Sequence, residues 1–174
     1  MAALTLTLIG RDRPGLVQSL SERVAAAGGN WLESRMARLA GQFAGILLID
    51  LPEANVERLA ADLRALEAEG LRATVERGLG EEAPAPYQTL VLELVGQDHP
   101  GIVRDIAQAL AGRRVNIEEL TTRVVSGSFS GERMFEAEAR LRVPADVSAT
   151  ELRESLEVLA NELMVDLRLD PAVG

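Results

Sequence analysis

The chain of 174 residues is 47% hydrophobic and 26% charged, an ordinary composition for a folded protein and enough for one domain or two. Its net charge of −9 disfavours direct contact with nucleic acid or anionic membranes, because both repel an acidic surface. It has no Cys and no Lys, and His99 is its only histidine, so thiol and catalytic-lysine chemistry are excluded and Asp and Glu would have to supply nearly every metal ligand. We expect no metal and no cofactor.

The first residues carry no targeting signal. Met-Ala-Ala-Leu-Thr-Leu lacks a basic region followed by an apolar core, and no apolar run reaches the length of about 18 residues that a membrane span needs. We therefore expect a cytoplasmic protein with no membrane contact.

The first half of the chain alternates strand and helix patterns. Leu4, Leu6 and Leu8 alternate with threonines, which predicts a strand with one buried face. A Gly-x-Asp-x-Pro-Gly turn follows, and then a helix that ends near Gly28. The buried face of that helix is predicted to hold Leu16, Val17, Leu20 and Val24. Strands at 30–39 and 43–51, a helix through Val56, Leu59, Leu63 and Leu66, and a strand at 71–76 complete the pattern.

The second half repeats the first. A shift of 86 residues aligns Gly10, Asp12, Pro14, Gly15, Val17, Ala25 and Asn30 with Gly96, Asp98, Pro100, Gly101, Val103, Ala111 and Asn116. A shift of 92 aligns Phe43 and Pro52 with Phe135 and Pro144, so the second copy gains six residues, which fall in the predicted hairpin loop SGSFSGER at 126–133. The second copy then predicts a helix ending near Gly112, strands at 115–125, 132–143 and 165–169, and a helix through Leu152, Leu156, Leu159 and Leu163.

This repeat predicts two domains of one fold class. A first unit at 1–78 and a second at 89–174 are joined by a linker at 79–88, rich in Gly, Glu and Pro. The order βαββαβ, twice, predicts an α+β protein of two ferredoxin-like units, each a four-stranded antiparallel sheet with both helices on one face.

The uncovered faces of the two predicted sheets differ. In the second copy the outward positions of the third strand hold Glu136, Glu138, Arg140 and Arg142, whereas in the first they hold Ala44, Ile46, Leu48 and Asp50, beside Thr5, Thr7 and Ile9. An apolar patch in the middle of a sheet usually marks a contact surface. We predict that this face packs against a protein partner or a second chain; alternatively, a loop or the linker covers it.

The repeated turn predicts a helix entrance that is open to solvent. Pro14 and Pro100 fit the first helical position, where a missing N–H costs nothing. Gly15 and Gly101 would leave the entrance without a Cβ, and the first glycine of each turn, Gly10 and Gly96, would let the chain turn sharply out of the strand. Free N–H groups at such an entrance attract a carboxylate or phosphate.

The polar residues of the turn leave alternatives open. Asp12 and Asp98 would accept hydrogen bonds from the first amides of the helix or contact the ammonium group of a ligand. Asn30 and Asn116 open the second strand, which we expect to run beside the loop; each binds the ligand or only completes the preceding turn. His99 has no nearby Ser or Cys to activate, which favours a ligand-edge or surface role over catalysis.

Together these features resemble the ACT domain, a small regulatory module that commonly binds amino acids. Two such units with little else resemble the glycine cleavage system transcriptional repressor group, and the likeness spans about Leu4 to Asp170. The resemblance implies an effector bound by the first loop and by the residue that opens the second strand. By position these are Gly10, Arg11, Asp12, Arg13, Pro14 and Gly15 with Asn30, and Gly96, Gln97, Asp98, His99, Pro100 and Gly101 with Asn116. The copies differ in that Trp31 follows the first Asn and Ile117 the second.

The resemblance also implies a function. We expect an amino-acid-sensing regulatory protein with no catalytic residues, a transcriptional co-regulator of glycine metabolism that acts through a protein partner such as a transcriptional activator rather than on DNA. We expect a homodimer, with the face of Ala44, Ile46 and Leu48 as the candidate contact. The alternatives are a ligand-free ACT dimerisation or interaction module and a detached regulatory subunit of a metabolic enzyme.

Overall fold

A computed structural model of the chain describes residues 1–78, 85–127 and 131–173. The chain divides into two compact units, Met1–Glu81 (unit 1) and Glu82–Gly174 (unit 2). Most of the predicted linker, 79–84, and the centre of the predicted loop SGSFSGER, 128–130, lie outside the described residues. Tyr87 and Gln88, the last residues of the predicted linker, already belong to a strand.

Unit 1 contains a four-stranded antiparallel sheet in the order β2-β3-β1-β4. The predicted elements are all present, and short 3₁₀ turns flank the second helix. The elements are β1 (Ala2–Arg11), α1 (Leu16–Ala26), β2 (Asn30–Leu39), β3 (Gln42–Leu51), η1 (Glu53–Asn55), α2 (Val56–Ala65), η2 (Leu66–Glu69) and β4 (Leu71–Arg77).

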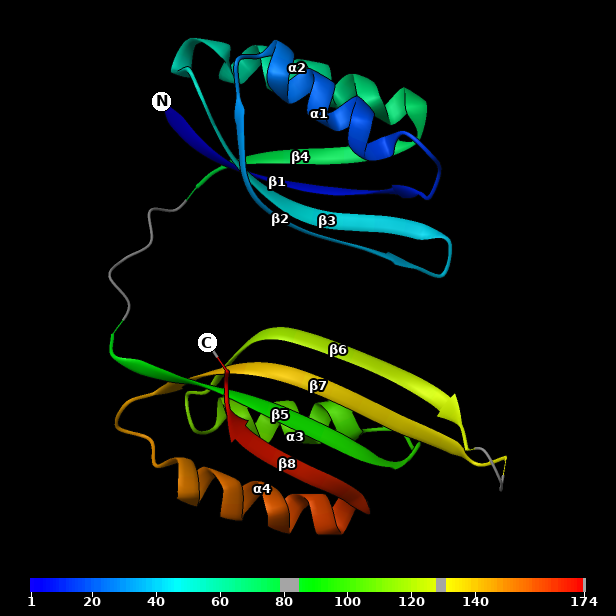
Figure 1. The fold of residues 1–174 in the computed structure, drawn as a ribbon, viewed down its shortest axis with the longest axis vertical. Coiled ribbons are helices and arrows are strands. Elements are labelled where there is room, and N and C mark those ends of the chain that lie inside the picture. Colours follow the sequence, from blue (N-terminus) through cyan, green and yellow to red (C-terminus); the bar gives the residue numbers. More distant parts are fainter. Residues whose placement is uncertain (79–84, 128–130, 174) are drawn as a thin grey trace. The chain divides into compact units, whose positions relative to one another are not determined.

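Unit 2 repeats this architecture, with the sheet order β6-β7-β5-β8. Its elements are β5 (Tyr87–Gln97), α3 (Ile102–Ala111), β6 (Asn116–Ser126), β7 (Arg133–Pro144), α4 (Ala149–Leu163) and β8 (Val165–Pro171). In each unit both helices lie on one face of the sheet (Figure 1). The predicted α+β class and the ferredoxin-like βαββαβ order are therefore confirmed.

The strand registers confirm the internal repeat. Gly10 pairs with Phe43 across β1 and β3, and Gly96 pairs with Phe135 across β5 and β7. Both second strands also carry a bulge at the same place, between Trp31 and Glu33 in unit 1 and at the matching step in unit 2. The two units thus share backbone detail as well as element order.

Each unit has its own hydrophobic core between its sheet and its helices. Leucine side chains on alternate residues of β1 meet the buried faces of α1 and α2, and unit 2 is built in the same way. The prediction that Val17 is buried is wrong, because it is 46% exposed, and its counterpart Val103 is 43% exposed. The buried helical faces instead hold Leu16, Leu20 and Val24 in α1 and Ile102, Ile106 and Leu110 in α3.

Both helices end where predicted, near Gly28 and Gly112, but the two glycines differ in conformation. Gly28 has φ of 72° and adopts the left-handed conformation that follows a helix. Gly112 does not: its φ is −60°, and the positive φ falls two residues later, at Arg114 (60°).

Candidate functional site

The first glycine of each repeated turn lies inside a strand, not at a turn. β1 continues to Arg11 and β5 to Gln97, so the predicted sharp bend at Gly10 and Gly96 is wrong. A Cβ on Gly10 would lie 2.5 Å from the carbonyl oxygen of Gly70, and one on Gly96 would lie 2.7 Å from that of Met164. These glycines are needed because the backbone that leads into β4 or β8 approaches them closely.

The second glycine sets the start of the helix. Gly15 (φ 88°) and Gly101 (φ 99°) adopt the left-handed conformation and precede the first helical residue. Pro14 and Pro100 therefore lie two residues before the first helical residue, and their predicted place at the first helical position is wrong. The left-handed glycine takes the place at which a polar side chain would normally cap the helix.

The aspartate of each turn anchors the loop to the neighbouring hairpin. Arg38 Nε donates to Asp12 Oδ2 at 2.7 Å, and Arg133 pairs with Asp98 at 3.1 Å. The amides of both aspartates donate to the hairpin backbone as well, at 2.9 Å. The carboxylates thus bind arginines rather than the first helical amides, which corrects the structural role predicted for them. The two arginines lie at unrelated sequence positions, so no local pattern could reveal the pairs.

The residue before each proline fastens the loop to the end of the second helix of its unit. In unit 1, Arg13 donates to the carbonyl oxygen of Glu69, the last residue of η2, at 3.3 Å and also pairs with its carboxylate at 3.5 Å. In unit 2, His99 Nε2 lies 2.8 Å from the carbonyl oxygen of Leu163, the last residue of α4. A positive charge is favourable there, because the carboxyl end of a helix carries partial negative charge.

His99 is held at both ring nitrogens. Its Nδ1 lies 3.1 Å from the carbonyl oxygen of Pro100, so both nitrogens face acceptors. A neutral imidazole has one N–H and can donate to only one of them, whereas the protonated ring donates to both. The pKa of His99 is accordingly raised, chiefly by the hydrogen bond to Leu163. These contacts let His99 hold the loop against the end of α4.

The helix entrances differ between the units. Nothing lies within 4 Å of the position that a Cβ on Gly15 would take, and the first turn of α1 has no acidic residue. At Gly101 the guanidinium of Arg104 lies 3.0 Å from the corresponding position, and Asp105 in the first turn accepts from Arg104 at 2.7 Å. The unit 1 entrance is therefore open, whereas side chains of unit 2 partly cover and neutralise its entrance.

The asparagines do not lie beside the loops of their own units. Asn30 opens β2 opposite Asp50, which pairs with Ala3 at the start of β1, whereas the loop follows the end of β1. Seven residues of extended strand, about 23 Å, separate the row of Ala3 from Gly10. Asn116 lies at the same distance from its loop, since it pairs with Arg142 in the row of Thr89. The expectation that the second strand brings its Asn to the loop is wrong within a unit.

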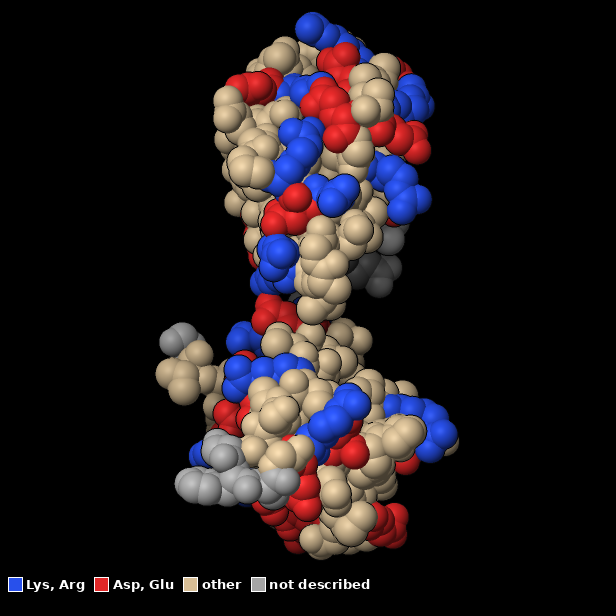
Figure 2. All heavy atoms as spheres, turned by 90° about the vertical axis from the view of Figure 1, so that its right-hand side faces the viewer, with Lys and Arg blue, Asp and Glu red and all other residues tan. Residues whose placement is uncertain are grey.

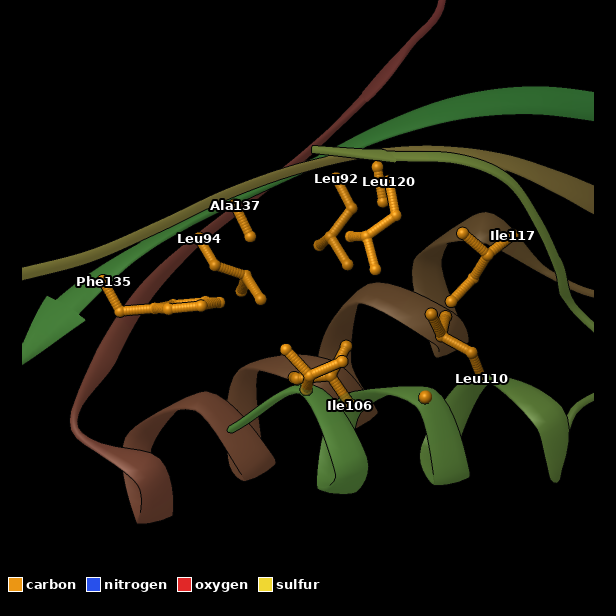
Figure 3. Close-up of a pocket in the computed structure, with 11 residues that line it drawn as sticks. Leu92, Leu94, Ile106, Leu110, Ile117, Leu120, Phe135 and Ala137 are labelled. Atoms are coloured by element: carbon orange, nitrogen blue, oxygen red, sulfur yellow. The ribbon is translucent and has the colours of Figure 1, made fainter. Parts of the chain in front are cut away.

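Among the described residues, two hollows of unit 2 stand out, and the residues of the predicted loops line neither. One lies between the sheet and α3, has room for about one water (≈ 20 Å³) and is lined by apolar side chains, eight of them labelled in Figure 3. It is too small and too apolar for a zwitterion. The other is a groove of ≈ 390 Å³ on the outer sheet face, lined by Glu93, Leu94, Val95, Thr121, Arg123, Glu136, Ala137 and Glu138.

Residues 1–78, 85–127 and 131–173 carry no sign of a metal site or a membrane span. No cluster of His, Asp and Glu there has the composition of a metal site. Among the described helices, none combines the length and the apolar character needed to cross a bilayer.

Comparison with known proteins identifies the class that this fold and these loops define. The ACT domain family matches residues 3–76 and 88–170, one match in each unit. The chain therefore belongs to the ACT domain family and carries two ACT domains in tandem.

Several known proteins resemble the chain over most of its length. The glycine cleavage system transcriptional repressor of Escherichia coli is 23% identical over 161 residues, which are 92% of this chain and 85% of the repressor. A solved structure of an unknown protein from Galdieria sulphuraria has a TM-score of 0.88 at 27% identity, with 99% of both chains covered. A structure assigned provisionally as a glycine cleavage system transcriptional repressor has a TM-score of 0.74 at 22% identity, covering 99% of this chain and 98% of its own, and shows the fold alone.

Proposed function

We propose that this protein senses a small amino acid and regulates through a protein partner, without catalytic activity of its own. Membership of the ACT family and the similarity to a transcriptional repressor of the glycine cleavage system support this proposal. By that analogy the protein is a transcriptional co-regulator of glycine metabolism that acts through a partner such as a transcriptional activator.

The open entrance of α1 is the observation that carries the proposal. Gly15 is exposed at the start of an 11-residue helix, nothing lies within 4 Å of the position that its Cβ would take, and the first turn has no acidic residue. An amino-acid carboxylate bound there would gain hydrogen bonds and the favourable field of the helix dipole. For a ligand of about five heavy atoms, the limit of about −1.5 kcal/mol per atom gives micromolar affinity at best, which suits a metabolite sensor.

The complete proposed site takes Gly10–Gly15 and Asn30, with Gly96–Gly101 and Asn116 as its counterpart in unit 2. A molecule as small as glycine cannot bridge about 23 Å between the loop and the Asn of one unit. We therefore propose that the loop of unit 1 is completed by Asn30 of a second copy of the chain.

A thermal-shift screen of the full chain against the twenty amino acids tests the proposal. We expect one or a few small amino acids to raise the melting temperature, and Asn30→Ala to reduce that rise. Asn116→Ala is the matched control, since the covered entrance in unit 2 predicts a smaller effect. If no amino acid stabilises the protein, or if neither substitution weakens the best response, the proposed site is refuted.

A second function, that of a ligand-free interaction module, is favoured by the internal contacts of the loops. The carboxylates of Asp12 and Asp98 pair with arginines, and Arg13 and His99 hold helix ends, so each of these side chains has a role that needs no ligand. This module would release no heat on titration with any amino acid. A detached regulatory subunit of an enzyme would instead change the rate of that enzyme on mixing.

The charge distribution supports a protein partner rather than nucleic acid. All 18 basic residues are arginines against 27 acidic residues. On the face drawn in Figure 2 the basic side chains are interspersed with acidic ones and form no continuous stripe. A phosphate backbone would find no extended basic surface on that face. The proposal places the protein in the cytoplasm.

A further inference from the structure

Asp50, near the end of β3, has a carboxylate oxygen that no group of the chain satisfies. Its Oδ1 is buried and has no hydrogen-bond partner, and it is the one side-chain atom in this condition among the residues that the structure describes. A buried acceptor without a donor costs free energy, and nearly all such atoms in folded proteins have a partner. A donor from outside the chain would remove this cost.

The strand register places Asp50 beside Asn30. Asn30 in β2, Asp50 in β3 and Ala3 in β1 form one row across the outer face of the sheet, the face opposite the helices. Side chains that oppose each other on neighbouring strands project from the same face, with Cβ atoms about 5 Å apart. Asn30 is exposed, and its side chain makes no hydrogen bond within the described part of the chain. The row thus holds an unpartnered carboxylate oxygen and a free amide side by side.

The charges around Asp50 favour a cation. Within residues 1–78 no arginine pairs with its carboxylate. Arg77, in the neighbouring row on β4, binds Glu53 instead. Glu76 adds a further carboxylate in the next row of the outer face. A positively charged group at Asp50 would therefore gain from the local field.

The loop of the proposed amino-acid site lacks an acceptor for an ammonium group. Asp12, the acidic residue of the unit 1 loop, is held by Arg38 at 2.7 Å. The start of α1 offers N–H donors, which suit the carboxylate of an amino acid and not its ammonium group. A bound zwitterion needs an acceptor elsewhere for its positive end, since a charge removed from water must be paired.

We propose that Asp50, together with Asn30, binds the ammonium group of the effector and makes the site selective for amino acids over 2-hydroxy acids. The proposal rests on the proposed function, in which Asn30 completes the loop site. The ammonium group donates one N–H to Oδ1 of Asp50 and a second to the side-chain oxygen of Asn30. A metal ion fits this pair poorly, because it would need more oxygen ligands than one carboxylate and one amide.

Unit 2 has a guanidinium group in place of this carboxylate. The shift of 92 residues aligns Asp50 with Arg142, which lies opposite Asn116. Arg142 donates to Glu118 at 2.6 Å and lies over the ring of Tyr87, 4.5 Å from its centre. A positive charge beside Asn116 opposes the binding of an ammonium group there. We therefore expect ammonium recognition in unit 1 and not in unit 2.

Isothermal titration of the full chain with three pairs of probes tests the proposal: glycine and glycolate, alanine and lactate, serine and glycerate. The members of a pair differ only in that a hydroxyl group replaces the ammonium group. We expect the wild type to bind at least one of the amino acids about tenfold or more tightly than its hydroxy acid, because a hydrogen bond between charged groups contributes at least that factor. In Asp50→Asn the preference should fall to within about threefold, through weaker binding of the amino acid.

Two matched variants remove a charge elsewhere. Glu76→Gln neutralises the carboxylate in the next row of the same face, and Arg142→Gln neutralises the residue of unit 2 that matches Asp50. Both should keep the preference within about threefold of the wild type, and circular dichroism checks that each variant folds. An equal loss of preference in Glu76→Gln would show that charge alone is responsible, which overturns direct contact with Asp50.

The melting temperature without ligand supplies an independent measurement. Asp50→Asn removes the charge from a buried oxygen that has no partner and should raise the melting temperature by about 2–5 °C, more than Glu76→Gln does. A lower melting temperature in Asp50→Asn would show that the carboxylate is satisfied in the free chain and would overturn the inference. So would an amino acid that binds Asp50→Asn as tightly as the wild type, although the proposed function would then stand. If none of the three amino acids binds the wild type, the inference fails, and the screen of all twenty decides the proposed function separately.

Discussion

Unit 1 and unit 2 have the same backbone fold but differ in their surface residues. At matching positions of the outer sheet face, unit 1 has Leu32 and Leu48 where unit 2 has Glu118 and Arg140, whose side chains pair at 3.6 Å. Arg142 also pairs with Glu118, at 2.6 Å, and lies over the ring of Tyr87. The two units therefore share the buried residues of one fold, while the outer sheet face has exposed apolar side chains in unit 1 and a network of ion pairs in unit 2.

Substitution of the buried strand glycines should destabilise both units by a similar amount. Gly10→Ala and Gly96→Ala each force a Cβ against backbone atoms less than 3 Å away, and we expect each to cost about 2–4 kcal/mol. Denaturant unfolding of the full chain measures this loss. Gly15→Ala is the control: its Cβ meets nothing, so only the left-handed conformation is strained, by about 1–2 kcal/mol. Equal costs at Gly10 and Gly15 would contradict the close-approach explanation.

Two substitutions should give the outer sheet face of unit 2 the apolar character of the unit 1 face. Glu138→Ile together with Arg140→Leu gives unit 2 the residues of unit 1, and we expect added self-association in sedimentation experiments because an apolar patch is created. Circular dichroism should show unchanged folding, since both positions face outward. A variant that associates no more than the wild type would show that the apolar patch alone does not define the contact surface.

The contacts of Arg13 and His99 that hold the two loops to their helix ends should differ in their response to pH. The raised pKa of His99 means that its protonated form stabilises unit 2. This stabilisation is complete below the ordinary value of 6.5 and is lost as the pH rises through the raised pKa, while Arg13 keeps its charge throughout. Hydrogen exchange between about pH 6 and 9, corrected for intrinsic rates, should show the end of α4 loosening while η2 is unchanged.

His99→Arg, which gives unit 2 the residue of unit 1, is the matched variant for that experiment. It should abolish the difference in pH response between the two units. Persistence of the difference in this variant would place its origin in another group.

Substitution of the turn aspartates should cause the smallest loss of stability among these variants. Asp12→Asn and Asp98→Asn remove the charge from exposed pairs with Arg38 and Arg133, and such pairs contribute about 0.2–1 kcal/mol. Faster hydrogen exchange at the nearby hairpin, with a nearly unchanged melting temperature, would fit this role. A large loss of amino-acid binding with no change at the hairpin would instead favour direct contact with the ligand.

The sequence predicts the fold almost completely, because the evidence for it is local or repeated. Alternating leucines in β1, the helical spacing of Leu16, Leu20 and Val24, and the shift of 86 residues fix the element order and most boundaries. The site is less predictable, since its contacts join residues distant in sequence. Arg38 lies 26 residues from Asp12, and the position of Asn30 depends on the strand register, which places it in the row of Ala3, at the opposite end of the strands from the loop.

The most direct test of the account is an NMR titration of the isotope-labelled full chain with glycine and with the best amino acid from the screen. We predict that the amide signals of Gly15, Leu16 and Asn30 shift together along one saturation curve, with smaller changes at Gly101. An absence of shifts at the Gly10–Gly15 loop at saturating ligand, or shifts confined to the outer groove of unit 2, would contradict the claim that the open entrance of α1 receives the effector.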